Sequence, residues 1–346
     1  MSDRLRELLA VDRTKIDVRR GSVGAVAVLI AIVFVVIFGT IGMTVGIAAL
    51  FVIAADQPGP VRQRWMGVLV ITIFGSLIAL VAVWAGIQHI WVAVLLTFTI
   101  TVVATLIAGF GHVVATRGLL LSLWAVIAFG FAGDEETALS IAIAFVGGGV
   151  IAAALLWAQA RGSRHEPVEA EAEAAAHTLE ELIRSPLAWF ALLRAGAVGI
   201  ATALGIVLVP EHAMWPALTV LLVMRPKAGE AVAAGVLRTI GTLGGVIVAE
   251  AVILIAGGSD VVVFLAFMLA AFAMVALKNV NYWVFVLFLT AVIVLSEALV
   301  GESAEAAAMQ RLFATVLGAA IAFLGIGLGR VIVQRQGDGA APASEA

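Results

Sequence analysis

Long apolar runs separated by short polar breaks fill most of the chain. A membrane-spanning helix needs about 20 mainly apolar residues, and most of the runs are close to that length. The runs are 22–39, 40–55, 63–84, 90–108, 114–132 and 137–158, followed by 187–209, 212–224, 232–256, 260–276, 280–298 and 304–331. This pattern predicts an all-α membrane protein with about twelve transmembrane helices.

Two of the runs, 40–55 and 212–224, are too short to cross a bilayer without help. The second lies in the stretch WPALTVLLVMRP, where Pro216 stands near its start, Thr219 lies inside it and Arg225 with Pro226 closes it. Interrupted backbone at membrane depth survives only where it is buried in protein or lines a wet cavity. Short segments at matching places in two halves of a chain are typical of a transport site.

The composition supports the membrane class and excludes several functions. Hydrophobic residues make up 63% of the chain and charged residues only 12%, and the chain has no cysteine. A soluble domain is about 45–50% apolar and about 25% charged. Disulfides and thiol chemistry are therefore excluded, and no nucleotide-binding loop or metal-site motif is present. The net charge of −3 is dispersed among the loops and gives no reason to expect a nucleic-acid partner. We expect no cofactor, no metal and no enzymatic activity.

The loop charges predict the orientation. Cytoplasmic loops carry an excess of Lys and Arg. Every second loop here is basic, with residues Arg4, Arg6, Arg13, Lys15, Arg19, Arg20, Arg62, Arg64, Arg117, Arg161, Arg164, Arg184, Arg225, Lys227, Lys278, Arg330 and Arg335. The intervening loops are acidic, with residues Asp134, Glu135, Glu136, Glu211, Asp260, Glu297, Glu302 and Glu305. We expect a multi-pass protein of a bacterial-type plasma (inner) membrane with both termini in the cytoplasm.

The organisation predicted from these features has five parts. They are a cytoplasmic amphipathic N-terminus (1–21), a first six-helix membrane unit (22–158), a polar linker helix in the cytoplasm (159–186), a second six-helix unit (187–331) and a disordered cytoplasmic tail (332–346).

The two membrane units resemble each other. Matching landmarks recur in order, namely Arg20 with Arg194, Pro58 with Pro226, an R-x-x-G from Arg64 to Gly67 with another from Arg238 to Gly241, and Gly148 with Gly318. Because six crossings return the chain to the same side, the units would be parallel repeats.

These landmarks resemble the fusaric acid resistance and aromatic acid exporter (FUSC) family of membrane transporters. The residues that carry the resemblance are Trp215 to Pro226, Arg238 to Gly245, Asn281, Tyr282, Phe285, Leu289, Thr290, Arg311 and Gly318, with Ala49 to Val52 and Asp56 to Pro60 in the first half. The resemblance implies export of small aromatic or other organic anions, driven by protons. The plant malate-permeating anion channels look like distant relatives. Many family members have a large cytoplasmic domain between the halves, whereas this chain has only the short linker.

Five polar or aromatic residues of the second half are candidates for contact with the substrate. Trp215 could stack on an aromatic substrate or anchor the helix at the interface, and Thr219 could bind a carboxylate or its own backbone. Arg225 and Arg238 could attract the anion at the inner mouth, or Arg225 could only orient the chain and Arg238 could snorkel to lipid. Tyr282, the single tyrosine, is a further candidate.

Glu250 is the candidate for proton coupling. It lies twelve residues beyond Arg238 in an apolar run. A carboxylate within a bilayer is costly unless it is paired, hydrated or protonated, so this one could load and release a proton. Arg311 enters from the same side and could pair with Glu250. A static ion pair and exposure near the membrane surface are the alternative interpretations.

The function predicted from these features is a proton-coupled secondary exporter of small, aromatic or other, carboxylates. Its partners would be the organic anion, protons and the lipid bilayer, and a homo-oligomer is compatible with the sequence. The alternatives are a passive organic-anion channel, which needs no coupling acid, and a non-transporting membrane scaffold that docks partners on the linker.

Overall fold

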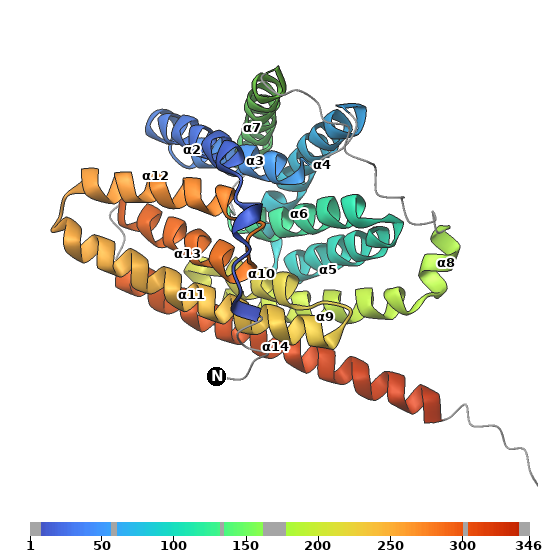
Figure 1. The fold of residues 1–346 in the computed structure, drawn as a ribbon. Coiled ribbons are helices and arrows are strands. Elements are labelled where there is room, and N and C mark those ends of the chain that lie inside the picture. The colour runs from blue at the N-terminus through green and yellow to red at the C-terminus, as the bar shows by residue number, and fades with distance from the viewer. Residues whose placement is uncertain (1–7, 57–60, 132–134, 162–177, 300–303, 339–346) are drawn as a thin grey trace, which may run out of the picture.

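The computed structural model describes residues 8–56, 61–131, 135–161, 178–299 and 304–338, and these residues fold into helices without a β-strand (Figure 1). Each of the twelve predicted runs forms a helix. In the first half they are α2 (Val18–Phe38), α3 (Thr40–Ala55), α4 (Val61–Gln88), α5 (Ile90–Ile107), α6 (His112–Phe129) and α7 (Glu135–Arg161). In the second half they are α9 (Pro186–Leu208), α10 (Met214–Val223), α11 (Ala228–Ala256), α12 (Asp260–Ala276), α13 (Tyr282–Leu299) and α14 (Ala304–Asp338).

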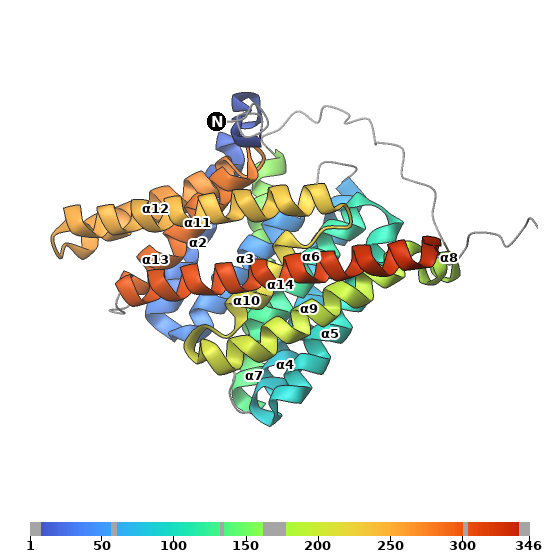
Figure 2. The ribbon, with the colours of Figure 1, turned by 90° about the horizontal axis from the view of Figure 1, so that it is seen from below.

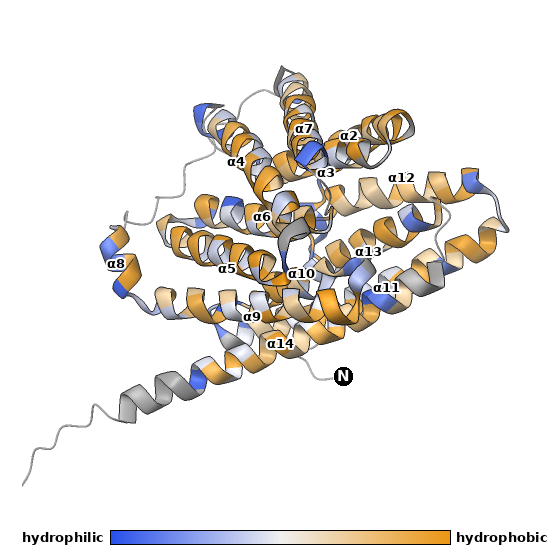
Figure 3. Cartoon of the chain, turned by 180° about the vertical axis from the view of Figure 1, so that it is seen from behind, coloured by the Kyte–Doolittle hydropathy of each residue, from blue (hydrophilic) through white to orange (hydrophobic). Residues whose placement is uncertain are grey.

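Nine of the helices in the described ranges are long and apolar enough to cross a membrane. The chain is therefore a multi-pass helical membrane protein, as the hydropathy pattern predicts. Three apolar helices are shorter, at Ile41–Ala55, Met214–Val223 and Asp260–Ala276. Figure 3 shows hydrophobic residues along most helices and hydrophilic residues at helix ends such as the start of α12.

The polar segments differ in detail from the predicted boundaries. Within the linker, only the short helix α8 (Leu179–Arg184) is described after α7, because 162–177 lies outside the described residues. At the N-terminus, the 3₁₀ turn η1 (Arg13–Lys15) precedes α2, which already begins at Val18. At the other end, α14 continues as a helix to Asp338, beyond the predicted start of the tail at 332. Residues 1–7 and 339–346 lie outside the described ranges.

Local sequence signals explain where several helices begin and end. Ser185 caps α9, its side chain accepting a hydrogen bond from the Leu187 N–H, and Pro186 occupies the first helical position. Gly257 adopts a left-handed conformation (φ 56°) that ends α11. α10 stops at Val223, just before Arg225 and Pro226, because the residue preceding a proline disfavours helix.

The same pairs of helices pack in each half. The second helix packs on the sixth (α3 on α7 and α10 on α14), and the third packs on the fifth (α4 on α6 and α11 on α13). Between the halves, the fourth helix of one packs on the first helix of the other, as α5 on α9 and α12 on α2. Figures 1 and 2 show these exchanged contacts, with α12 beside α2 and α5 beside α9.

The short helix α10 is enclosed by protein. It packs against α9, α14, α6 and α11, and eight of its ten residues are buried. In Figure 2, α14 and α9 run across the bundle beside it. An isolated ten-residue helix could not satisfy its ends in lipid, but neighbouring helices cover this one on several sides. The surroundings of α10 thus explain why its sequence is short and interrupted.

The ends of the helices meet in two groups, which we call the basic end and the acidic end. At the basic end, Lys278 donates to the Ala54 carbonyl and Asn281 donates to the carbonyls of Leu8 and Ala10. At the acidic end of the second half, the α9–α10 connection meets the end of α13 and the start of α14, since His212 contacts Glu297 and Gln310. The contacts at both ends thus join segments that lie far apart in the sequence.

Glycines allow α11 and α13 to approach closely. A methyl group built on Gly245 would lie 2.4 Å from the Leu287 carbonyl oxygen and 2.6 Å from Thr290 Cβ. A backbone oxygen cannot move aside as a flexible side chain can. The small-residue spacing from Gly241 to Gly245 therefore serves helix packing, as is common in membranes.

Replacing Gly245 by alanine should push α11 away from α13 and lower the free energy of unfolding by about 1–3 kcal/mol. Gly196→Ala is the matched control, because no atom lies within 4 Å of the added methyl and it should be neutral or slightly stabilising. Thermal unfolding of the two variants in detergent measures the difference. Equal stability of both variants would contradict the close packing.

Candidate functional site

The second half contains two buried arginines that interact electrostatically. Arg238, on α11, is 2% exposed, and Arg311, on α14, is 3% exposed. Arg311 lies in the electrostatic field of Arg238, which Glu297 partly offsets, and neither arginine forms an ion pair with a carboxylate of the described residues. Burying a charge without a partner is strongly unfavourable, so this part of the bundle carries an excess of positive charge.

α10 supplies the groups that hold these arginines. The Nε of Arg238 donates to the Thr219 hydroxyl at 3.3 Å, and this hydroxyl donates in turn to the Trp215 carbonyl at 3.1 Å. The guanidinium carbon of Arg311 lies 4.6 Å from the centre of the Trp215 ring, which is cation–π geometry. Thr219 and Trp215 are one helical turn apart, so they present their groups on one face of α10.

His212 covers the same indole ring. Its imidazole stacks on Trp215 with ring centres 4.0 Å apart and an angle of 29° between the planes. Its two nitrogens contact Gln310 on α14 and Glu297 on α13. The Trp215 ring is thus occupied by side chains of the protein, and an aromatic molecule would have to displace one of them to stack there.

Several buried donors of the second half, including atoms of both arginines, have no acceptor among the described residues. They are Nη1 of Arg238, Nε of Arg311, and the hydroxyls of Tyr282, Thr242 and Thr290. Tyr282 also contributes to the electrostatics of Arg311. Each unsatisfied buried donor costs about 1–3 kcal/mol. We call the group formed by Trp215, Thr219, Arg238, Tyr282 and Arg311 the arginine site.

The arginine site unites five of the seven residues proposed from the sequence. The other two lie elsewhere. Arg225 is exposed beyond the end of α10 and influences Arg194 rather than the buried arginines. Glu250 is half-buried on α11, one of its oxygens is buried without a hydrogen bond, and it has no ion pair with Arg311. The static Glu250–Arg311 pair, one of the alternatives from the sequence, is therefore not formed in this structure.

The sequence does not indicate three residues that contact this site, namely His212, Glu297 and Gln310. His212 stands at a loop edge and has no neighbour at metal-ligand spacing, so it looks exposed in the sequence. The available signal is topological, because all three residues fall near predicted outer ends of helices, those of α10, α13 and α14. Only the packing of α10, α13 and α14 reveals that these ends meet.

In the first half, a buried carboxylate of the chain itself pairs with the arginines. Asp56, 3% exposed, accepts two hydrogen bonds from Arg64, at 2.8 Å from Nε and 2.7 Å from Nη2. Arg20 donates to the Asp56 backbone carbonyl at 2.6 Å, just as Arg194 of the second half donates to the Leu221 carbonyl at 2.5 Å. Arg238, the proposed counterpart of Arg64, has only a threonine in place of the carboxylate.

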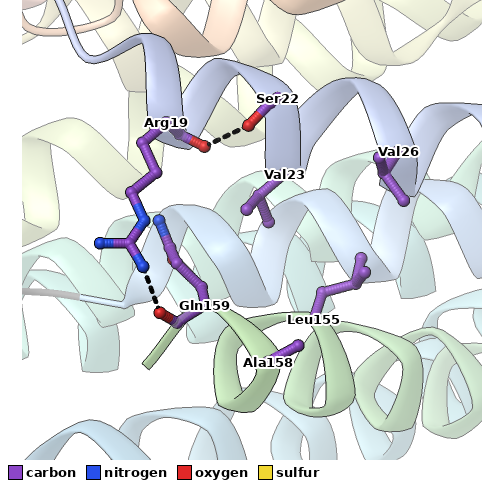
Figure 4. Close-up of a pocket in the computed structure, with 7 residues that line it drawn as sticks. All are labelled: Arg19, Ser22, Val23, Val26, Leu155, Ala158 and Gln159. Carbon is purple, nitrogen blue, oxygen red and sulfur yellow. Dashed lines mark hydrogen bonds between the residues drawn. The ribbon is translucent and has the colours of Figure 1, made fainter. Parts of the chain in front are cut away.

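A shallow groove between α2 and α7 is a weaker candidate. It is lined by Arg19, Ser22, Val23, Val26, Leu155, Ala158 and Gln159 (Figure 4). The Arg19 guanidinium already donates to the Gln159 backbone carbonyl, and the remaining lining is mostly apolar. The described residues contain no cluster of three or more His, Asp or Glu side chains that could hold a metal.

The architecture and the buried arginines define a multi-pass helical membrane protein with a positively charged interior. The family described as fusaric acid resistance protein-like matches residues 187–325, which covers the arginine site. This match confirms, for the second half of the chain, the resemblance seen in the sequence. No match was found among curated proteins or among solved structures. The family and the many apolar helices point to a transporter-type function.

Removing the carboxylate of Asp56 should destabilise the basic end, because Arg64 and Arg20 would lose their counter-charge. We expect Asp56→Asn to lower the free energy of unfolding by about 2–4 kcal/mol. Glu230→Gln is the control, since Glu230 is exposed and its pair with Lys227 should contribute under about 1 kcal/mol. Unfolding by SDS in mixed micelles measures both. A loss equal to that of the control would contradict a structural role for Asp56.

Lys278 should make stability rise with pH. Burial, and then the nearby Arg20, lower the pKa of Lys278 from 10.5 to about 8. Between these values the unfolded chain binds more protons than the folded one, so raising the pH favours folding. Compared with Lys278→Met, the wild type should therefore gain stability between pH 8 and 10 and should be the less stable of the two at pH 7. The SDS assay, repeated across this range, tests the sign.

Proposed function

We propose that this protein is a secondary transporter that exports small organic carboxylates, and that the arginine site binds the anion. The observation that carries the proposal is the burial of Arg238 and Arg311 without a carboxylate partner. A bound carboxylate would neutralise part of this charge and accept hydrogen bonds from the donors that have no acceptor. The empty state is then costly, and occupation by an anion relieves that cost.

The positions of the proposed contacts suggest roles for individual residues. Arg311 and Arg238 would hold the carboxylate, Thr219 would orient Arg238, and the Tyr282 hydroxyl would donate a further hydrogen bond. Arg225, exposed near the basic end, would attract the anion from the cytoplasm. An aromatic substrate would stack on Trp215 by replacing His212, so aromatic preference would depend on the mobility of that histidine.

The fold that would support transport is a pair of parallel six-helix repeats. The helix pairs that recur in each half and the exchanged contacts of α5 with α9 and α2 with α12 favour this arrangement. On this proposal the short helices α3, α10 and α12 complete twelve crossings, with both termini on the cytoplasmic side of a plasma membrane. α10 would then lie in the interior of the second repeat, where transporter sites are common.

Glu250 is the proposed proton-coupling acid. Its buried oxygen has no hydrogen bond, and protonation would remove the charge that is costly there. In an exporter driven by protons, Glu250→Gln should abolish movement driven by a pH gradient. In a passive anion channel, the alternative, the same variant should conduct much as the wild type does.

Replacing either arginine should impair anion transport strongly. In liposomes that contain only this protein, Arg238→Gln and Arg311→Gln should each lower benzoate flux about 10- to 100-fold, because one charged hydrogen-bond donor is lost. Arg330→Gln, which changes an exposed arginine at the far end of α14, should retain wild-type flux. The flux is measured with an imposed pH gradient and a clamped membrane potential.

The same experiment separates the candidate functions. Uphill movement that vanishes with the gradient supports a coupled exporter, and movement only down the anion gradient supports a channel. Wild-type flux in both arginine variants would contradict the proposed site. No flux of any aromatic or aliphatic carboxylate would contradict transport and favour the scaffold.

A further inference from the structure

Both ring nitrogens of His212 face oxygen atoms. Nδ1 lies 2.5 Å from Oε1 of Gln310, and Nε2 lies 3.2 Å from Oε1 of Glu297. A neutral imidazole has one N–H and can donate to only one of these oxygens. With the Gln310 oxygen toward Nδ1, satisfying both contacts takes a second proton, carried by the imidazole or by the Glu297 carboxyl. With the Gln310 amide rotated, its N–H would donate to Nδ1, and the contact of Nε2 with Glu297 would be the one that titrates. This geometry describes a proton-binding pair.

The pair borders the arginine site. The imidazole stacks on Trp215, and Arg311 lies against the same indole ring. Glu297 also contributes directly to the electrostatics of Arg311, together with Arg238 and Tyr282. The other described ionisable side chains of α11 and α14 are Glu230, Glu250 and Arg330, and α9 has no ionisable residue in its last twelve positions. A change of charge on the pair therefore alters the electrostatic potential at the arginines.

We propose that His212 and Glu297 form a proton switch that sets the anion affinity of the arginine site; this inference rests on the proposed function. Without the second proton the pair carries one negative charge, which competes with an incoming anion for the field of Arg311. With the proton the pair is neutral overall, and the arginines attract the anion more strongly. By thermodynamic reciprocity, binding of the anion also favours uptake of the proton.

The switch lies at the acidic end of the second half, where η3 (Pro210–His212) meets the end of α13 and the start of α14. His212 and Glu297 are about one-seventh exposed (15% and 13%), so protons from that side can reach them. Histidine ordinarily changes its charge between about pH 5 and 8. The affinity for anions should consequently change within that range.

The test measures binding of benzoate to the full chain in lipid nanodiscs between pH 5.5 and 8, where benzoate remains ionised. We expect the wild type to bind about 5- to 10-fold more tightly at pH 5.5 than at pH 8. His212→Gln should show little change with pH. Glu297→Gln lacks the negative charge throughout, so its affinity at pH 8 should approach that of the wild type at pH 5.5. Asp260→Asn, at an exposed carboxylate at the start of α12, is the control and should keep the wild-type pH dependence.

The outcomes distinguish this inference from the proposed function. Binding that requires Arg311 but is independent of pH in the wild type, or that keeps its pH dependence in His212→Gln, overturns the switch and leaves the anion site standing. Wild-type binding that is unchanged in Arg311→Gln, or no binding of benzoate, overturns the arginine site and the switch's effect on affinity.

A second measurement needs no ligand. A charged imidazole stacked on an indole quenches its fluorescence, so part of the wild-type emission should fall as the pH falls. This part should be missing in both Trp215→Phe and His212→Gln. A pH dependence that is identical in the wild type and in His212→Gln would overturn the proton-binding pair directly.

Discussion

The balance of charge around Arg238 and Arg311 is the constraint on which the second half depends. Two guanidinium groups in a bundle of apolar helices would repel each other and lose most of their hydration. The structure holds them with a hydroxyl, an indole face and no carboxylate in contact. Neither the hydroxyl nor the indole neutralises the charge, and this is why the proposed function places the anion here.

The first half shows what a closed version of such a site looks like. Asp56 is as deeply buried as the arginines of the second half, and it binds Arg64 through both carboxylate oxygens. This internal carboxylate fills the role that a ligand would fill elsewhere. If the halves descend from one repeat, one copy has become structural and the other has kept an open charge. The presence of one carboxylate in the first half and its absence from the second would account for this difference between the two halves.

The sequence predicts the class, the positions of the helices and much of the candidate site, because each depends on local patterns. Apolar runs define the helices directly, and a charged residue inside a run, such as Arg238 or Arg311, stands out. Contacts between the ends of different helices cannot be predicted from such local patterns. The stacking of His212 on Trp215 depends on how α9, α10, α13 and α14 are arranged, and no spacing in the sequence encodes it. For the same reason the alternative pairing of Arg311 with Glu250 looked reasonable, although Arg311 lies against Trp215 instead.

The sign of the charges limits the mechanisms open to such a site. A proton bound at His212 and Glu297 adds positive charge near Arg311, so protons and anions favour each other's binding there. Exchange of a proton for an anion requires the opposite, namely that one leaves as the other arrives. An exchanger would therefore need a second acid, whose protonation depends on the conformation of the protein rather than on contact with the anion. In the proposed transporter Glu250 would be this acid, because it shares α11 with Arg238 but forms no ion pair with Arg311. Without such an acid, the pair at His212 would make the anion pathway sensitive to pH but could not drive uphill export.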